Sequence, residues 1–259
     1  MVSLLLLSFK HQWSAQIKKP LEFIIGLIAL ILNNSFYLYG IYLLAILTSD
    51  DNSLAAKEYL VSTGIVLTSW GLLNVLGGGL HQLGNLIETG ELEVYLAKPR
   101  SPLFLVALSK SNLMSFGEVL QGIATIGVCA ILYDLSLGLR MFASSVILIF
   151  AFASVIIMIG TFSFFTSRGS QISYVILQVL LNLSLFPVSR ALRGREKWIL
   201  YFTPLLVTAT FPRLMVIQND LTTSLAFIGT TIVFLWAGIC FFNFGLRYFK
   251  SKNYIFLNE

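Results

Sequence analysis

The chain has 259 residues, of which 57% are hydrophobic and 11% are charged, and its formal net charge is +5. A soluble domain carries about twice that share of charged residues, so lipid must be the main solvent of this chain. The basic residues are scattered between apolar blocks and form no stripe with interleaved aromatic residues, which argues against nucleic-acid binding. The apolar blocks are continuous rather than alternating, which excludes a closed barrel and predicts an all-α membrane protein.

The first predicted element is a helix over residues 3–19 that lies on the membrane surface. Its apolar residues recur at steps of four on one face, and they are Leu5, Phe9, Trp13 and Ile17. This pattern is typical of an interfacial helix. Pro20 would then turn the chain into the bilayer. The alternative is a frayed tail with a tryptophan anchor.

Six apolar blocks follow that are long enough to cross the hydrocarbon layer as transmembrane helices. They cover about residues 23–47, 59–80, 112–133, 141–165, 171–189 and 222–246. An even number of spans places both termini on one side of the membrane. The loops and tails on that side hold ten of the Lys and Arg residues, and the loops on the other side hold seven. By the positive-inside rule, both termini are predicted to be cytoplasmic.

The connection between the second and third spans is a charged loop over residues 82–101. Its charged residues are Glu88, Glu91, Glu93, Lys98 and Arg100. About two turns of amphipathic helix are predicted after Gly90, with Leu92, Tyr95 and Leu96 on one face. Pro99 ends this helix, because a proline disfavours helical backbone at the residue before it. Taken alone, such a loop is either a solvated connector or a docking element.

The connection between the fifth and sixth spans is broken by three prolines, Pro187, Pro204 and Pro212. The apolar stretch Trp198–Val207 within it is too short to cross the membrane. It is predicted to be a re-entrant or interfacial segment on the outer side. Backbone of this kind must be shielded by protein or water.

No motif for catalysis, metal binding or nucleotide binding occurs in the sequence. Only His11 and His81 are histidines, so the His-Glu-x-x-His zinc motif is absent. The cluster Gly77–Gly79 lacks the Gly-Lys-Ser/Thr sequence of a phosphate loop. Cys129 and Cys240 lie inside apolar blocks and are expected to be packing residues. We therefore expect no catalytic residue, no metal and no cofactor bound by this chain.

Several polar residues interrupt the predicted spans. Glu118 is the one carboxylate well inside a span, and intramembrane charge is costly enough to indicate a functional site, unless Lys110 or a neighbouring helix pairs with it. The candidate pathway or dimer-interface residues are Asn74, His81, Glu118, Gln121, Gln178 and Asn182. Small and amide side chains also hold membrane helices together, so helix packing without substrate contact is the alternative.

The order of these parts, and one motif above all, resembles a known family. The motif is Ile87–Leu103, which reads IETGELEVYLAKPRSPL. Weaker matches are Leu185–Pro187 followed by Thr203–Pro204 and Phe211–Pro212, and the ending Phe244–Tyr248. With these features the chain resembles the permease subunits of type-2 ATP-binding-cassette (ABC) transporters.

The resemblance implies a transport role without an ATPase activity of the chain's own. It implies a coupling loop that docks on a separate nucleotide-binding ATPase subunit, and its residues would be Glu88, Gly90, Glu91, Leu92, Glu93, Tyr95, Leu96 and Pro99. ATP and Mg would be bound by that partner. A second permease chain, identical or not, would complete the pathway in the bacterial inner membrane. Such systems generally export drugs, lipids or glycans.

Two other functions fit part of the sequence. An ion-coupled secondary transporter would use Glu118 as its proton or sodium site, although matched broken helices typical of that class are not seen. A non-transporting scaffold would explain the polar faces but not the coupling-like loop.

Overall fold

The computed structural model describes residues 20–47, 52–166, 168–186 and 204–249, and every regular element within these ranges is helical. The all-α prediction is therefore confirmed for the described part of the chain. In lipid a helix satisfies its backbone hydrogen bonds within one segment, which is why continuous apolar blocks fold in this way. The predicted interfacial helix over residues 3–19 and most of Trp198–Val207 lie outside the described residues.

The described helices fall into a long apolar group and a short group. The long helices are α2 (Pro20–Leu47), α3 (Asn52–Gly77), α7 (Phe116–Leu132), α8 (Leu135–Thr161), α9 (Gly169–Leu185) and α13 (Leu221–Gly245). The short ones are η1 (Gly78–Gln82), α4 (Leu83–Thr89), α5 (Glu93–Leu96), α6 (Pro102–Ala107), η2 (Leu113–Ser115), η3 (Phe162–Phe164), η5 (Leu206–Thr210), α12 (Phe211–Gln218) and η6 (Leu246–Tyr248).

Five helical stretches of the described chain are long and apolar enough to cross a membrane. They contain α2, α3, α7, α8 and α13, so the protein is a multi-pass membrane protein. The fifth predicted span corresponds to α9, whose 17 described residues reach about 25 Å at the usual helical rise. This length is at the lower limit for a crossing. The six-span count stays a prediction.

Two of the helices begin well before the apolar block that predicted them. Helix α3 begins at Asn52 rather than at residue 59, and α8 begins at Leu135 rather than at residue 141. The added turn of α3 carries Lys57 and Glu58, which hydropathy excludes from a span. Helical backbone does not stop at the edge of the hydrocarbon layer, so charged turns continue the helix into the polar region.

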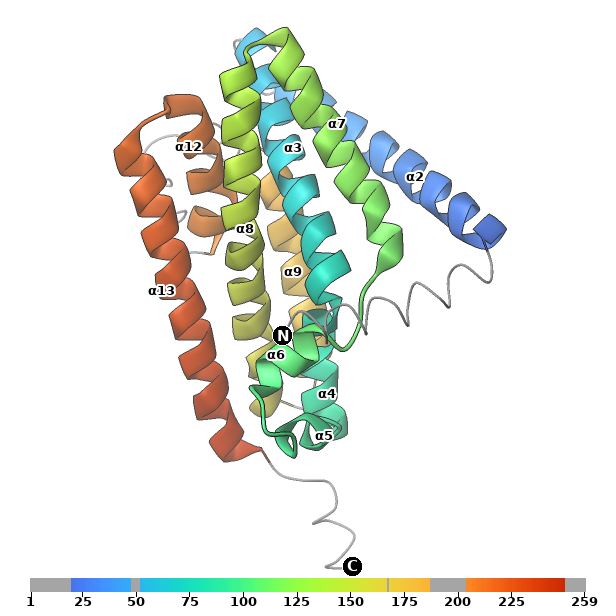
Figure 1. Cartoon of the computed structure of the whole chain (residues 1–259), viewed down its shortest axis with the longest axis vertical. Coiled ribbons are helices and arrows are strands. Elements are labelled where there is room, and N and C mark those ends of the chain that lie inside the picture. Colours follow the sequence, from blue (N-terminus) through green and yellow to red (C-terminus); the bar gives the residue numbers. More distant parts are fainter. Residues whose placement is uncertain (1–19, 48–51, 167, 187–203, 250–259) are drawn as a thin grey trace, which may run out of the picture.

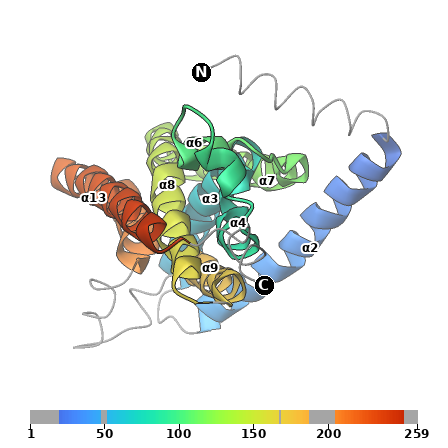
Figure 2. The same ribbon diagram turned by 90° about the horizontal axis from the view of Figure 1, so that it is seen from below.

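Helices α3 and α8 form the centre of the bundle, and α7, α9 and α13 pack around them (Figures 1 and 2). Helices α4, α5 and α6 gather at one end, together with the start of α9 and the end of α13 (Figure 1). We call this the loop end. The turn between α7 and α8 and helix α12 lie at the opposite end (Figure 1).

Glycines let the backbones of α3 and α7 touch. A Cβ atom on Gly71 would lie 2.8 Å from the backbone nitrogen of Val119. A Cβ atom on Gly122 would lie 2.5 Å from the backbone nitrogen of Thr68. Small residues at such contacts are the usual means of close helix approach in membranes. Helices α3 and α7, which correspond to the second and third predicted spans, therefore meet each other here.

Serine hydroxyls add hydrogen bonds between the central helices and their neighbours. Ser69 of α3 donates to the carbonyl oxygen of Ser145 in α8 at 3.0 Å. Ser173 of α9 donates to the carbonyl oxygen of Ile159 in α8 at 2.9 Å. Each hydroxyl group also lies near a carbonyl oxygen one turn earlier in its own helix, that of Ile65 for Ser69 and that of Gly169 for Ser173, so its one hydrogen is shared between two acceptors. The contacts between helices join α3 and α9 to α8.

Helix α2 lies at an angle to the bundle (Figures 1 and 2), contacting α7 where Gly117 faces Leu30 and Ile31 and contacting α3 where the hydroxyl group of Tyr59 donates to the carbonyl oxygen of Leu38 at 2.5 Å. Its side chains are largely exposed, with Phe36 at 78% and Leu21 at 71%. Gln121 of α7 holds it in place by donating from Nε2 to the carbonyl oxygen of Ile31 at 2.9 Å and to Oγ of Ser35 at 3.0 Å.

The described part of the proline-broken connection is a short helix at the opposite end. It consists of η5, which is a π-helical turn, and α12. Pro212 stands in the first turn of α12, directly after the π-helical turn η5, so the backbone widens just before the residue that lacks an N–H group. Val207 and Val216 are fully buried, and the hydroxyl group of Ser144 in α8 donates to the carbonyl oxygen of Pro212 at 3.0 Å. This element is a packed part of the bundle and is too short to cross the membrane.

Candidate functional site

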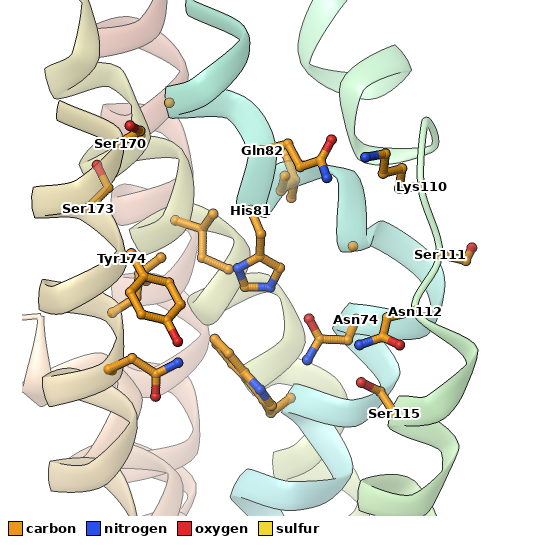
Figure 3. A pocket seen from close by; sticks show the side chains of 18 of the residues that line it. Asn74, His81, Gln82, Lys110, Ser111, Asn112, Ser115, Ser170, Ser173 and Tyr174 are labelled. Carbon is orange, nitrogen blue, oxygen red and sulfur yellow. The ribbon is translucent and has the colours of Figure 1, made fainter. Parts of the chain in front are cut away.

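A cavity of about 510 Å³ lies inside the bundle toward the loop end (Figure 3). Helices α3, α7, α8 and α9 line it, together with η1 and the segment 110–112. Its polar lining residues are Asn74, His81, Gln82, Lys110, Ser111, Asn112, Ser115, Glu118, Ser170, Ser173, Tyr174 and Gln178. A polar cavity of this size inside a membrane bundle is the best candidate for a binding site, since ligand sites are commonly 300–1,000 Å³.

The glycine cluster that follows α3 docks the segment that closes the cavity. A Cβ atom on Gly79 would lie 1.9 Å from the carbonyl oxygen of Val106, so only glycine fits. The backbone nitrogen of Gly79 donates to the carbonyl oxygen of Lys110 at 3.0 Å, and that of Asn112 donates to the carbonyl oxygen of Asn74 at 2.9 Å. The cluster is thus a backbone contact between two chain segments.

Glu118 lies in the first turn of α7 and lines the cavity. Its Oε2 atom is buried and has no hydrogen-bond partner. Its polar neighbours are Ser115, one turn earlier, and Asn74 of α3. Lys110 lines the same cavity but is exposed, and Figure 3 shows its side chain beside Gln82, away from Ser115. Among the residues that the structure describes, the Oε2 atom of Glu118 therefore stays without a partner.

An aromatic wall faces the polar residues of the cavity. The ring of His81 meets the ring of Trp70 edge to face at 5.0 Å, and Nε2 of His81 is buried without a hydrogen-bond partner. Trp70 in turn packs on Phe152 at 5.4 Å. The side chain of Tyr174 reaches in from α9 toward His81 (Figure 3). Aromatic and polar residues thus line one space, while the unpaired atoms of His81 and Glu118 are buried beside it.

The structure brings four of the six predicted pathway residues together. Asn74, His81, Glu118 and Gln178 all line the cavity. Gln121 does not, because its amide bonds α2 on another face of α7. Asn182 is exposed and stands one turn beyond Gln178, outside the lining. Residues 118 and 121 are only three positions apart on α7. Helix α2 packs against Gln121, whereas Glu118 lines the cavity.

Sequence reasoning missed Trp70, Asn112 and Tyr174, which also line the cavity. Trp70 and Tyr174 looked like ordinary apolar content of a span, because aromatic residues carry no polar signal. The spacing of Ser170, Ser173 and Gln178 could have indicated a polar face, since these positions share one side of a helix. Gln171, which lies between Ser170 and Ser173 in the sequence, is exposed and is not part of the lining.

The charged loop at the loop end folds back on the bundle at Gly90. Gly90 has φ 79°, a left-handed conformation that side chains other than glycine disfavour. The turn it makes is closed by a hydrogen bond from the backbone nitrogen of Leu92 to the carbonyl oxygen of Leu86 at 3.0 Å. The left-handed backbone of Gly90 and this hydrogen bond thus set where the loop after α4 turns back.

The expected amphipathic face of this loop is divided between the core and the surface. Helix α5 has one turn, rather than two. Leu92 is fully buried in the hydrophobic core, whereas Leu96 is 37% and Val94 is 60% exposed. Tyr95 is half-buried, and the ammonium group of Lys98 lies 5.4 Å from its ring centre. Leu92 therefore anchors the loop from inside, while Val94 and Leu96 face outward.

Glu88 connects the loop to α9. Its Oε1 accepts a hydrogen bond from the backbone nitrogen of Ser170 at 2.8 Å, and its Oε2 accepts one from the hydroxyl group of Ser170. A carboxylate at the first turn of a helix accepts hydrogen bonds from free backbone N–H groups and interacts favourably with the positive end of the helix dipole. A Cβ atom added to Gly84 of α4 would lie 3.1 Å from Cα of Ser170, so α4 and the start of α9 are in close contact.

The remaining predicted loop residues are distributed over its outer surface. Glu91 and Pro99 are exposed, and Glu93 is half-buried. Together with Val94 and Leu96 they form a mixed apolar and acidic surface at the loop end, which we call the outer loop surface. Within the described ranges, no three His, Cys, Asp or Glu side chains gather as a metal site requires.

A family model described as "ABC-2 family transporter protein" matches residues 31–253, which is most of the chain. No curated protein and no solved structure matches the chain significantly.

Proposed function

The chain belongs to the ABC-2 family of transporter proteins, and we propose that it is the permease subunit of an ATP-driven exporter. The observation that carries this proposal is the family match over residues 31–253 of a multi-pass helical chain. Membership of this family implies work alongside an ABC ATPase subunit, which binds ATP and Mg in our proposal. The ion-coupled alternative has no support from the family match.

In the proposed orientation the loop end faces the cytoplasm of a bacterium, and both termini lie there. The described basic residues support this orientation. Those at or near the loop end are Lys98, Arg100, Lys110, Arg168 and Arg247, and those at or near the opposite end are Lys57, Arg140 and Arg213. An excess of Lys and Arg in short loops favours the cytoplasmic side.

The outer loop surface is the proposed docking site for the ATPase subunit. Val94 and Leu96 offer apolar contact, and Glu91 offers charge. The buried Leu92 prevents the loop from moving alone, so a push on it must shift α4. Through Glu88 and Ser170 that shift reaches α9, whose residues Tyr174 and Gln178 line the cavity. ATP-driven movement at the surface would thus change the shape of the cavity.

The second permease chain, identical or not, is proposed to pack on the exposed apolar surface of the bundle. Helix α2 offers the largest candidate, because its side chains, such as Leu21 and Phe36, are exposed in the single chain. Membrane lipid would cover whatever part of this surface the second chain leaves free. The pathway would then lie between the two chains.

Purification from native membranes tests the proposed partnership. A tagged chain should retain an ABC ATPase subunit through affinity and size-exclusion steps in mild detergent, and the complex should hydrolyse ATP. The variant Gly90→Ala should keep the fold but uncouple hydrolysis from export, because alanine strains the backbone at a φ of 79°. Gly229→Ala is the matched control, since nothing lies within 4 Å of its added Cβ atom.

A chain that exports cargo without any ATPase subunit would refute the proposed function. Equal coupling of ATP hydrolysis to export in the Gly90→Ala and Gly229→Ala variants would refute the role of the loop alone.

A further inference from the structure

We propose that the cavity binds an uncharged group that carries several hydroxyls, such as the sugar headgroup of a glycolipid. The inference goes beyond the proposed function, because it concerns binding by this chain alone. It depends neither on the ATPase subunit nor on the direction of transport.

Three primary amide side chains of the cavity lining provide the first step of the argument, and they belong to Gln82 of η1, Asn112 and Gln178 of α9. No hydrogen bond joins any of these amide groups to another residue of the described ranges. A ligand can reach them, since Gln82 and Gln178 are half-buried and Asn112 is exposed. Each amide therefore offers an oxygen acceptor and an NH₂ donor to a molecule in the cavity.

The charged residues of the lining disfavour an ionic ligand. Among the described lining residues, Lys110 is the one Lys or Arg, whereas phosphate and carboxylate groups are commonly held by several charge-assisted hydrogen bonds. Glu118 is the lining carboxylate, but its partnerless Oε2 atom is buried in the protein, where a cation does not reach it. The lining therefore favours an uncharged polar ligand.

The placement of the amides favours a ligand with several hydroxyl groups. An apolar group would leave the amides unpaired, which costs binding free energy, whereas a hydroxyl group can both donate and accept. Figure 3 shows Gln82 and Asn112 on the side of the cavity opposite Tyr174 of α9, and Gln178 follows Tyr174 by one turn. Hydroxyl groups spread around one sugar ring can reach both sides, which a single polar group cannot.

The apolar part of the lining indicates what the hydroxylated group is attached to. Leu30 of α2, Ile156 of α8 and Leu177 of α9 form this part. Such side chains offer no hydrogen bond to a sugar but suit an alkyl chain joined to it. A glycolipid and a free sugar both present the required hydroxyl groups, and the apolar part of the lining favours the glycolipid.

Native mass spectrometry of the purified full chain tests the inference. The chain is titrated with glucosyl dioleoylglycerol, here called the glucolipid, in tetraethylene glycol monooctyl ether, a detergent without sugar. Dioleoylglycerol has the same acyl chains without the sugar and is the comparison lipid. We expect saturable binding of the glucolipid that is at least about tenfold tighter than that of dioleoylglycerol, as several ordinary hydrogen bonds would give.

Two glutamines on α9 provide matched variants. Gln178→Leu should weaken glucolipid binding about three- to tenfold, the size expected when one amide loses its hydrogen bonds to the ligand. Gln171→Leu makes the same replacement at an exposed residue outside the lining and should leave binding unchanged. Asn112→Ala is a second variant with the same expected loss. It keeps the hydrogen bond from the backbone nitrogen of residue 112 to the carbonyl oxygen of Asn74.

Equal affinity for the glucolipid and dioleoylglycerol would overturn the inference, because the sugar would then contribute nothing. Tighter binding of phosphatidic acid than of the glucolipid would also overturn it, since charge would then decide the affinity. Unchanged glucolipid binding in both Gln178→Leu and Asn112→Ala would overturn it as well.

Free glucose in excess distinguishes the two sources of the hydroxylated group. Displacement of the glucolipid would show that a free sugar is a sufficient ligand, and no displacement would assign the cavity to a glycolipid. Co-purification of the ATPase subunit is measured separately, so the proposed function can fail while the binding site stands, and the reverse.

Discussion

At the scale of single residues, Glu88 and Leu92 show how a short charged loop is bound to a membrane bundle. The carboxylate of Glu88 accepts two hydrogen bonds from Ser170, and the side chain of Leu92 is fully buried. The first contact is electrostatic and directional, and the second is apolar. Together they leave the loop few ways to move independently of α4 and α9.

Replacement of Glu88 tests the connection to α9. Glu88→Ala should lower the free energy of unfolding by about 1 kcal/mol, because the first turn of α9 loses its acceptor and the site is half-exposed. Glu88→Gln keeps one oxygen acceptor for the backbone nitrogen and should lose about half as much. Thermal unfolding in detergent measures both variants. Equal midpoints for Glu88→Ala and the unaltered chain would show that the contact contributes nothing.

At the scale of elements, the contact between α3 and α7 decides where the cavity ends. Toward the opposite end, Gly71 and Gly122 bring the two backbones together and leave no space. Toward the loop end the contact continues, because the backbone nitrogen of Asn112 donates to the carbonyl oxygen of Asn74 at 2.9 Å, and Asn74 and Glu118 line the cavity beside it. One pair of helices therefore both packs together and contributes residues to the candidate site.

A pair of glycines on α7 tests the packing. Gly122→Val should destabilise the bundle by about 1–3 kcal/mol, because the added atoms meet the backbone of Thr68 and the core must be overpacked. Gly127→Val on the same helix should have an effect near zero, since no atom lies within 4 Å of its added Cβ. The fraction of monodisperse protein after heating measures both. Comparable losses in the two variants would contradict the close contact.

At the scale of the whole molecule, the bundle has a loop end with most of the described basic residues and an opposite end with few. Helix α2 stands partly apart and exposes apolar side chains (Figure 2). A single chain of this shape has both a polar cavity and an unpaired apolar surface. Both features suit one half of a larger assembly in lipid.

Cysteine labelling tests the proposed orientation in the membrane. Cys129 and Cys240 are first replaced by serine, and single cysteines are then introduced as Ser101→Cys at the loop end or Leu221→Cys at the opposite end, both at exposed positions. A maleimide that cannot cross membranes should label Leu221→Cys in intact cells and Ser101→Cys only in inverted vesicles. The reverse pattern would place the loop end outside.

The sequence alone predicted the helical class, the membrane setting, the family resemblance and a turn at Gly90. These properties depend on local composition, because the length of an apolar block and the backbone freedom of glycine act without distant contacts. It also selected Asn74, His81, Glu118 and Gln178, since a polar group inside a span is costly wherever the helix lies.

Only the tertiary structure decided which of these residues share one space. Gln121 and Glu118 are three residues apart on α7, yet Gln121 bonds α2 while Glu118 lines the cavity. Leu92 and Leu96 were predicted to share one face of a helix, yet the fold buries Leu92 and leaves Leu96 exposed. Helix rotation and the approach of neighbours set these outcomes, and both depend on contacts such as that between Gly122 and Thr68, which residues far apart in the chain make together.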